Sequence, residues 1–236
     1  MIRTLTTAAA LLACATTAAA QDAPPEAPSE TPSGSWSFAV GAATDNRSRD
    51  VSNSGGDPFV WGEAQWESAS GLFYAGAGAE TIKSSGADLE VQLNAGFRPQ
   101  VAGFDVTLAA THKWQIDADP GADAEAWEFT ADVARSIGPA SGRLRLQYSP
   151  DGTGATEAWT WAEARVGWAF TDKLEASAAI GRREQDNSVD YTGWNVGFSY
   201  ALTRSLEADL RYHANDADLP DERYDDALVA GLSFAF

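Results

Sequence analysis

The sequence predicts an all-β fold, in which twelve antiparallel strands form one up-and-down barrel. Three observations favour this fold class. Apolar and polar residues alternate with a period of two from Trp36 onward, the breaks between the alternating runs are long and short in turn, and aromatic residues gather at the ends of the runs. Because successive side chains of a strand point to opposite faces, each run is expected to be a strand with one apolar and one polar face.

Length and composition exclude several classes of function. The chain has 236 residues and a formal charge of −18, so we expect no nucleic-acid binding, because an acidic surface is repelled by phosphate. The only cysteine, Cys14, lies in a segment that we expect to be removed, which leaves no thiol for disulfides, metals or nucleophilic attack. Two histidines leave little scope for a zinc site, and no cofactor is predicted. No window approaches the roughly 20 uncharged apolar residues of a transmembrane helix.

The first residues predict export. Residues 1–20 contain Arg3, an apolar Ala/Leu run and a final Ala18-Ala19-Ala20, the pattern of a cleaved secretory signal peptide. An alternative interpretation takes the segment before Cys14 as a lipobox with an acylated cysteine, which requires a very short leader. Residues 21–34 contain four of the ten prolines together with scattered acids, and predict an extended periplasmic linker.

Residues 35–236 carry the predicted barrel strands. The clearest run is 88–98, in which Leu89, Val91 and Leu93 alternate with Glu90 and Gln92. Five of the six later prolines fall between runs and the sixth begins one, where a missing N–H group does least harm to a sheet. The twelve expected strands are 35–45, 58–67, 71–80, 88–98, 103–115, 124–135, 142–149, 157–170, 173–183, 190–200, 204–213 and 225–236.

The breaks between the runs predict which end of the barrel carries loops. Breaks after odd-numbered runs are long and polar (46–57, 81–87, 116–123, 184–189 and 214–224). Breaks after even-numbered runs are mostly short (68–70, 99–102, 171–172 and 201–203), with 136–141 as the longest exception. Short periplasmic turns that alternate with longer external loops are typical of an outer-membrane barrel with both termini in the periplasm.

The aromatic residues favour a membrane barrel over a soluble sandwich. On the face expected to point outward, one end of the runs carries Trp36, Phe38, Trp66, Phe73, Phe97, Phe104, Trp168, Phe170, Tyr200 and Phe234, and the other carries Trp114, Trp127, Tyr148, Trp194 and Tyr212. Two aromatic girdles around an apolar band match the two interfaces of a bilayer. A sandwich, the alternative, would place its large residues in mid-strand.

Four residues do not fit this scheme well. His112 falls on the outward face near a strand end. By their place in the alternation, Trp61, Trp159 and Trp161 belong to the lumen face. We expect a bulge to turn them to the outer face, where they would join the girdle. A platform that stacks a ligand is the alternative.

The end of the chain suggests an assembly signal. Leu232, Phe234 and Phe236 share the outward face of the last run. A terminal Phe on such a strand resembles the signal read by the outer-membrane barrel-assembly machinery, which is therefore an expected partner.

The opposite face predicts a charged lumen. Its ten acids and eight bases are close to balance, so most are expected to pair across neighbouring strands. Arg143 and Arg145 are expected between Glu128 and Asp132 on one side and Glu163 on the other. The lumen-facing charges are Glu63, Asp88, Glu90, Arg98, Asp105, Lys113, Glu128, Asp132, Arg143, Arg145, Glu163, Arg165, Lys173, Glu175, Arg183, Glu207, Asp209 and Arg211.

The number of strands predicts a narrow channel for small hydrophilic solutes or ions. Eight strands are filled by side chains, whereas roughly 16 to 18 leave an aqueous channel, and twelve lie between. Lumen glycines are expected to leave space, among them Gly41, Gly76, Gly78, Gly167, Gly181, Gly197 and Gly231. The alternative is a non-conducting structural or adhesive barrel whose ion pairs fill the lumen.

Acidic residues in the external loops predict a weak preference for cations. They are Asp117, Asp119, Asp123, Glu184, Asp186, Asp190, Asp216, Asp218, Asp221 and Glu222. A negative rim concentrates cations at the mouth of a pore. Alternatively, these acids bind divalent cations that bridge to lipopolysaccharide, which together with membrane lipid is an expected partner.

The first third of the chain carries a set of short motifs, at Asp45, Arg47, Arg49, Val51, Ser52, Ser54, Gly56, Asp57, Pro58, Ser70, Gly71, Tyr74, Ala75, Gly76, Glu90, Ala95, Gly96, Phe97 and Arg98. At these positions the chain resembles the TorF family of small outer-membrane porins. The resemblance implies a barrel and a channel, without a substrate, and covers about residues 40–110. Asp50 stands where the family usually has a glycine, and Ala77-Gly78-Ala79 lacks a tryptophan that is common there.

The charged residues of the first loop have two interpretations. Arg47 and Arg49 bind phosphate groups of lipopolysaccharide or a solute anion, or they pair with Asp45, Asp50 and Asp57 to order the loop. We favour the second interpretation. Gly55-Gly56-Asp57-Pro58 predicts a turn that leads into the second strand.

No enzymatic activity is expected. His213 is the only lumen-side candidate for acid–base chemistry, near Asp209 and Asp216, and no nucleophile is identifiable beside it. The sequence names no solute and does not decide between a monomer and a trimer.

Overall fold

The structure is a computed structural model that describes residues 33–154 and 156–236. The predicted signal peptide, residues 1–20, lies outside the described residues, as do residues 21–32 of the predicted linker. Within the described ranges, no helix has the length and apolar character needed to cross a membrane.

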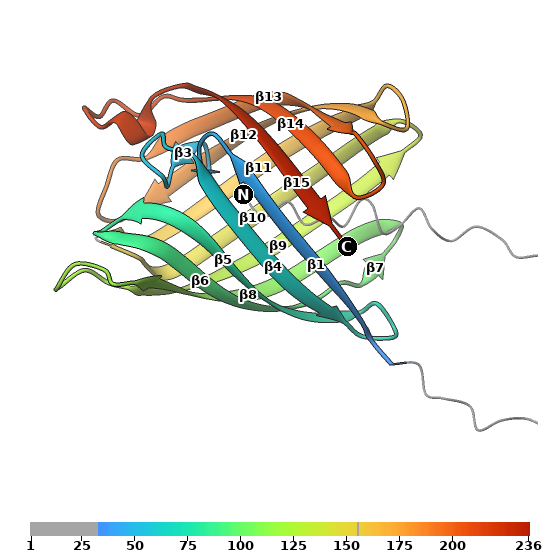
Figure 1. The fold of residues 1–236 in the computed structure, drawn as a ribbon, viewed down its shortest axis with the longest axis horizontal. Helices are drawn as coiled ribbons and strands as arrows, with labels where there is room; N and C mark the ends of the chain where they lie inside the picture. Colours follow the sequence, from blue (N-terminus) through green and yellow to red (C-terminus); the bar gives the residue numbers. More distant parts are fainter. Residues whose placement is uncertain (1–32, 155) are drawn as a thin grey trace, which may run out of the picture.

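Twelve long strands form the wall of a closed antiparallel barrel (Figure 1). Strand β1 pairs with both β4 and β15, and β6 pairs with β8, so the sheet closes without a free edge among these strands. The predicted fold class is therefore confirmed. The wall strands are β1 (Ser35–Ala43), β4 (Phe59–Glu67), β5 (Phe73–Ser84), β6 (Ala87–Phe97), β8 (Phe104–Ile116), β9 (Glu125–Ile137), β10 (Ala140–Gly152), β11 (Glu157–Ala169), β12 (Leu174–Gln185), β13 (Tyr191–Ala201), β14 (Leu206–Asn215) and β15 (Ala227–Ala235).

Among residues 33–154 and 156–236, three shorter strands and one short helix lie outside the wall. β2 (Arg47–Ser48) and β3 (Val51–Ser52) pair only with each other, and β7 (Gln100–Val101) pairs with the start of β8. The 3-10 helix η3 (Glu222–Tyr224) lies in the loop between β14 and β15. We call the end of the barrel that holds Ser35 and Phe236 the turn end. The end that holds β2, β3 and η3 is the loop end (Figure 1).

Two breaks are shorter than the sequence predicted. The expected loop 81–87 is wrong, because β5 and β6 continue to a two-residue turn at Ser85 and Gly86, with φ of 52° and 80°. Two consecutive residues with positive φ form the type I′ turn that matches the twist of a hairpin. The break 136–141 likewise shortens to Gly138 and Pro139, because β9 and β10 extend toward each other. It is therefore no exception among the short turns.

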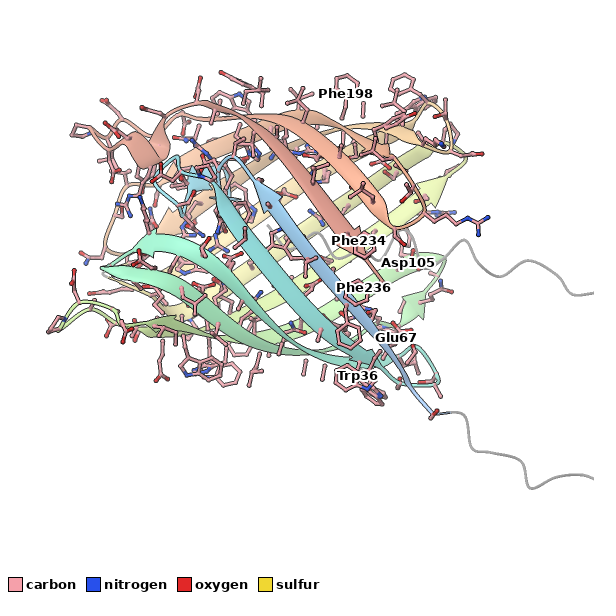
Figure 2. The ribbon with its side chains drawn as sticks, viewed as in Figure 1. Trp36, Glu67, Asp105, Phe198, Phe234 and Phe236 are labelled. Carbon is pink, nitrogen blue, oxygen red and sulfur yellow. The ribbon has the colours of Figure 1, made fainter. Side chains whose placement is uncertain are left out.

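The outer face of the wall is apolar. In β10, Leu144 and Leu146 are 64% and 54% exposed, while the intervening Arg145 points inward to Asp132. Figure 2 shows Phe198 pointing away from the barrel, and Trp36 near the turn end. His112 also lies on this face, with its ring centroid 4.1 Å from that of Trp114.

The three tryptophans of lumen parity point inward, contrary to the predicted bulge. The register between β11 and β12 is continuous from Trp159 to Ala169, so no bulge reverses the parity of β11. Trp159 and Trp161 are only 3% and 1% exposed. They are therefore part of the interior and not of the outer girdle.

The lumen glycines accommodate neighbouring side chains, and so they do not leave the open space that the sequence predicted. A Cβ atom at Gly181 would collide with the Trp161 indole, and one at Gly41 would lie 2.5 Å from Trp61 Nε1. The absence of a side chain on one strand makes room for an indole from the next. This packing explains why no bulge is needed to place these tryptophans.

Candidate functional site

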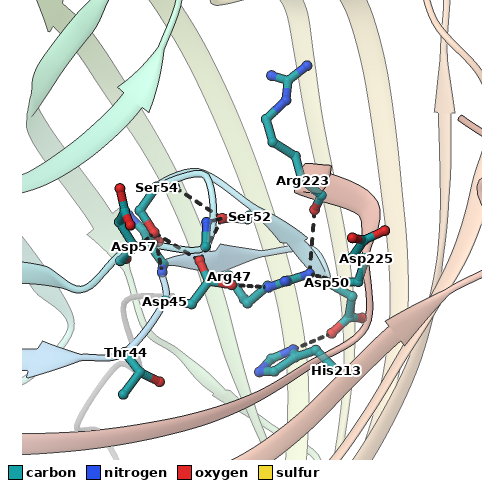
Figure 3. Close-up of polar contacts among 12 residues, drawn as sticks. Thr44, Asp45, Arg47, Asp50, Ser52, Ser54, Asp57, His213, Arg223 and Asp225 are labelled. Atoms are coloured by element: carbon teal, nitrogen blue, oxygen red, sulfur yellow. Dashed lines mark hydrogen bonds and ion pairs between the residues drawn. The ribbon is translucent and has the colours of Figure 1, made fainter. Parts of the chain in front are cut away.

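The first loop, residues 44–58, turns into the barrel at the loop end and carries the hairpin of β2 and β3. Figure 1 shows β3 within the outline of the barrel, and Figure 3 shows the contacts of the loop in close-up. The hairpin turn consists of Arg49 and Asp50, with φ of 53° and 63°. Asp50 and Ser52 are each 1% exposed, and Asn46 is fully buried. The loop is therefore packed as an interior element.

Asp45 orders the base of this loop. Its carboxylate accepts hydrogen bonds from Ser52 Oγ at 2.6 Å and Ser54 Oγ at 2.9 Å, and it pairs with Arg47 (Figure 3). Arg47 also donates to the Asp225 carbonyl oxygen at 2.6 Å. Arg47 thus orders the loop and joins it to the segment after η3, as the second interpretation of the loop arginines expected.

Asp50 anchors the tip of the hairpin to the barrel wall. Its Oδ1 lies 2.8 Å from His213 Nδ1 (Figure 3). The same oxygen accepts a hydrogen bond from Asn195 Nδ2 at 2.8 Å. Asn215 Nδ2 donates to the Asp50 carbonyl oxygen at 3.3 Å. His213 was expected near Asp209 and Asp216. It instead contacts the inserted loop, because the loop occupies the space beside β14.

Arg49 joins the hairpin to the opposite part of the wall. Its guanidinium contacts Glu128 at 3.4 and 3.5 Å and lies 4.2 Å from the centre of the Trp159 ring. Tyr191 donates to the Arg49 carbonyl oxygen at 2.9 Å. Arg49 therefore pairs with an acid of the wall and not with Asp45, Asp50 or Asp57 of its own loop.

Below the hairpin, charged side chains pair across neighbouring strands. Arg145 donates two hydrogen bonds to Asp132, at 2.7 and 2.8 Å, and Arg143 donates one to Glu163 at 2.7 Å. Arg165 lies 3.4 Å from the same Glu163 carboxylate. Parity places these five side chains on the inner face of β9, β10 and β11, where each arginine meets an acid from an adjacent strand or from its own strand.

Other predicted lumen residues have partners farther around the wall. Lys113 contacts Glu90 at 2.9 Å and Glu128 at 3.5 Å. Arg211 is 3% exposed and donates to Asn195 Oδ1 and Ser177 Oγ, both at 2.9 Å, and it lies 3.4 Å from Asp209. Residues Glu63, Glu175 and Glu207 are half-buried.

Near the turn end, Arg98 connects three neighbouring side chains. Its guanidinium contacts Glu67 at 3.2 Å and Gln65 at 3.1 Å, and it lies 3.7 Å from the centre of the Tyr74 ring. These contacts fix the guanidinium against the wall of β4 and β5.

Three residues predicted in the lumen are exposed at its margins. Asp88 follows the β5–β6 turn, and Lys173 lies in the turn before β12. Asp105 accepts a hydrogen bond from Gln100 Nε2 at 2.8 Å beside β7, near the turn end (Figure 2). Their parity is that of the lumen, but no opposite wall covers the inner face at the ends of the strands. The lumen position of these three residues therefore stays a prediction.

The hairpin divides the interior into two cavities. The larger has a volume of about 510 Å³ and extends from Ser35 and Phe236 at the turn end to Arg49. The smaller has a volume of about 130 Å³ and lies at the loop end. Both cavities are lined by Ser48, Arg49, Lys113 and Glu128. These four residues, which we call the constriction, form the partition between the two spaces.

Sequence reasoning missed the residues that hold the hairpin. Tyr191, Asn195 and Asn215 have the parity of the inner face, but nothing in their own strands indicates that a loop lies against them. For Trp159 a signal existed, because its parity already placed it inside. The spacing of charged residues alone did not reveal the partition.

The acidic rim is partly paired. Asp221 caps η3 and accepts hydrogen bonds from Arg223, and this guanidinium holds the pKa of the Asp221 carboxyl below its ordinary value. Asp190 lies 3.5 Å from Arg182. Most of the other loop acids are exposed, among them Asp117, Asp119, Asp123, Glu184, Asp186, Asp218 and Glu222. Glu222 is the first residue of η3, and Asp218 precedes this helix in the same loop.

Solved structures with a similar fold are outer-membrane channels. A KdgM porin aligns with a TM-score of 0.58 and 9% identity, over 85% of this chain and 99% of that one. The NanC porin gives 0.57 and 9% identity, over 84% and 98%. The COG4313 outer membrane channel from Pseudomonas putida F1 gives 0.51 and 10% identity, over 91% and 99%. A further KdgM structure is a complex with disordered oligogalacturonate.

At these identities the similarity establishes the fold alone. No curated protein matches the sequence. The sequence model of one family does match, over residues 27–231, and its description is a bacterial protein of unknown function. That match spans the entire barrel wall except its last strand residues. The chain therefore belongs to the Gcw_chp family of bacterial proteins.

Proposed function

We propose that this protein is an outer-membrane channel for passive diffusion of small hydrophilic solutes or ions. The observation that carries the proposal is the cavity of about 510 Å³ inside the wall, lined mainly by polar and charged side chains. A polar interior inside an apolar exterior is the arrangement that an aqueous path through a lipid bilayer requires.

The fold and the resemblances support the same proposal. Twelve strands lie between the number that side chains fill and the number that leaves a wide pore, so a narrow bore is expected. The similar barrels are a KdgM porin, the NanC porin and the COG4313 channel. The TorF resemblance of the first third points to a porin as well. We accordingly propose export by residues 1–20, contact with membrane lipid and lipopolysaccharide, and a location in the outer membrane of a Gram-negative cell.

The test is liposome swelling with neutral sugars and amino acids of increasing size. A channel of this bore is expected to admit the smallest solutes faster than protein-free liposomes, with influx falling steeply as solute size grows. The alternative is a structural or adhesive barrel that does not conduct. It is favoured by the inserted hairpin, whose anchor Asp50 is 1% exposed. Influx equal to that of protein-free liposomes at every solute size would support this alternative.

We further propose a weak cation preference at the mouth of the channel. The exposed loop acids give the loop end a negative potential, and such a rim concentrates cations before they enter. In a planar bilayer with a salt gradient, the reversal potential is expected to have the sign of a cation-selective pore. A reversal potential of the opposite sign would show that the rim does not control selectivity.

The end of the chain supports a proposed role in assembly. Phe236 exchanges two backbone hydrogen bonds of 2.9 Å with Phe38, and its ring stacks on the Phe38 ring at 5.6 Å. We propose that Leu232, Phe234 and Phe236 are also recognised by the barrel-assembly machinery. Phe236→Ser is then expected to reduce assembly in cells far more than spontaneous refolding in detergent, whereas equal losses would indicate a purely local role in closure.

We propose no enzymatic activity. The candidate base His213 is 3% exposed and contacts Asp50 of the inserted loop, so it is engaged in holding the hairpin. If the wild type showed lipase or protease activity that His213→Ala abolished, this part of the proposal would be wrong.

A further inference from the structure

Two arginines at the loop end contact the same indole. The Cζ atoms of Arg49 and Arg183 each lie 4.2 Å from the centre of the Trp159 ring. Arg49 comes from the inserted hairpin and Arg183 from β12, so the inserted loop brings together two cations that are far apart in the sequence. A guanidinium over an indole gains cation–π attraction, which fixes its plane.

Arg183 lacks an acidic partner within the described part of the chain. Its Nε donates to Gln185 Oε1 at 2.9 Å, and its exposed fraction is 8%. A buried cation that no carboxylate neutralises is destabilised by the loss of its hydration. An anion beside this guanidinium would relieve that cost.

The charge balance around Arg183 also favours an anion. The small cavity of about 130 Å³ is lined by the cations Arg49, Lys113 and Arg183, and by two acids, Glu90 and Glu128. A fourth cation, Arg223, is already engaged by Asp221. Three cations other than Arg223 therefore line this cavity together with two carboxylates, which leaves its lining with an excess of positive charge.

The contacts of Arg49 leave it able to bind an additional group. Its two contacts with Glu128, at 3.4 and 3.5 Å, are longer than the 2.7–2.9 Å that is usual for a charge-assisted hydrogen bond. Its Nε is buried without a hydrogen-bond partner. The contacts of the Arg49 guanidinium with Glu128 are therefore weak, and its Nε–H group can donate a further hydrogen bond.

We propose that the cavity beside Trp159 binds the oxyanion group, a carboxylate or phosphate, of a small acidic solute. Arg49 and Arg183 donate to the oxygens, and Lys113 adds a further positive charge. Liquid water occupies about 30 Å³ per molecule, so the cavity has room for about four waters or for one oxyanion. This proposal rests on the proposed channel function, because it names a class of solute that would bind at the constriction. The acidic rim at the mouth is a separate feature, which attracts cations.

The site is tested by titrating the purified full-length protein in detergent with inorganic phosphate, using isothermal titration calorimetry at low ionic strength. Wild type is expected to bind phosphate, and Arg183→Gln to bind it at least tenfold more weakly. Arg182→Gln is the matched control, because Arg182 is the adjacent residue in β12 and is exposed, at 46% of its side chain. Its affinity is expected to equal that of wild type.

Three outcomes would overturn the proposal: no binding by wild type, equal binding by Arg183→Gln, or equal weakening by Arg182→Gln. A second measurement needs no variant. Phosphate is expected to slow hydrogen exchange of the backbone amides of residues 48–52 and 183–185 in the wild type, and unchanged exchange would also overturn the site. Liposome swelling separates the two proposals, since phosphate binding without solute influx contradicts the channel alone, and influx without phosphate binding contradicts the site alone.

Discussion

At the scale of single residues, the hairpin turn combines backbone strain with strong anchoring. Arg49 and Asp50 both have left-handed φ angles, of 53° and 63°. Such a conformation costs an arginine roughly 1–2 kcal/mol, whereas aspartate tolerates it better. The turn persists because the Asp50 side chain is held by Asn195 and His213, and the Arg49 carbonyl oxygen accepts a hydrogen bond from Tyr191. The TorF family usually has a glycine at the position of Asp50. The anchoring contacts explain why this chain has an aspartate there.

Replacement of that anchor should release the hairpin. Asp50→Ala removes two hydrogen bonds to a charged group, leaves His213 and Asn195 without this partner and keeps the strained backbone, so the docked loop is expected to lose roughly 2–4 kcal/mol. Hydrogen exchange of the amides of residues 47–53 should become faster, while the wall strands stay protected. Asp57→Ala is the control, because Asp57 is exposed and pairs with Lys83 outside the interior. Equal protection in Asp50→Ala and wild type would contradict the anchoring role.

A second prediction at this scale concerns Gly181. Gly181→Ala places a methyl group against the Trp161 indole, which is 1% exposed and has little freedom to move. Overpacking of this kind costs roughly 1–3 kcal/mol. Gly142→Ala is the matched control, because the nearest atom to its Cβ, the Arg165 carbonyl oxygen, is 4.0 Å away. Urea unfolding in detergent should show a lower midpoint for Gly181→Ala only, and equal midpoints would show that the indole can shift freely.

At the scale of elements, the β2–β3 hairpin decides how much of the lumen is open. It closes the larger cavity at the constriction, and it is held from both sides by wall residues. The loop that carries η3 supports it, because Arg47 donates to the Asp225 carbonyl oxygen. The hairpin is therefore the element expected to limit passage through the proposed channel.

Replacement of the hairpin should widen the channel. A variant in which residues 46–53 become eight Gly and Ser residues removes Arg49, Asp50 and their contacts while leaving the loop length unchanged. Single-channel conductance in a planar bilayer is expected to rise severalfold, because the partition between the two cavities is lost. The same type of replacement in loop 186–189 is the control and should leave conductance unchanged. If both variants conducted like wild type, the hairpin would not limit the flow.

At the scale of the whole molecule, the apolar exterior predicts where a charge is tolerated. Leu146 is 54% exposed near the middle of β10, and its neighbour Gln147 lines the larger cavity. An arginine on the lipid face near the middle of a bilayer costs roughly 2–4 kcal/mol. Leu146→Arg is therefore expected to destabilise the barrel folded in lipid vesicles by about this amount, as a lower free energy of unfolding, and Gln147→Arg is expected to destabilise it much less. Equal effects on folding would contradict a lipid-facing exterior.

Much of the fold could be predicted, because the alternation of apolar and polar residues within a strand shows which of its faces meets lipid and which meets the interior. Leu144, Arg145 and Leu146 identify the two faces of β10 without reference to any other strand, and Pro139 falls in a break between two strands, where its missing N–H group does least harm. The errors occurred where a position depends on a distant segment. Trp159 and Trp161 were expected in the outer girdle, but they lie inside the barrel, because glycines on the neighbouring strands leave room for their indoles.

The candidate site was less predictable for the same reason. Arg49, Trp159 and Arg183 are separated by 110 and 24 residues, and no local pattern connects them. The two interpretations of the loop arginines could not be decided from composition, because Arg47 pairs with its own loop while Arg49 reaches the opposite wall. The inward tryptophans were misassigned because the glycines that receive them lie on neighbouring strands.

The sequence by itself determined the strands, their apolar and polar faces and the closure of the barrel, because side-chain alternation and turn residues act over a few neighbouring positions. The tertiary structure alone decided that the first loop enters the barrel, that Asp50 meets His213, and that Arg49 and Arg183 share one indole. These contacts depend on how the strands are arranged around the lumen. Curvature and register bring their side chains together, and no short stretch of sequence contains that information.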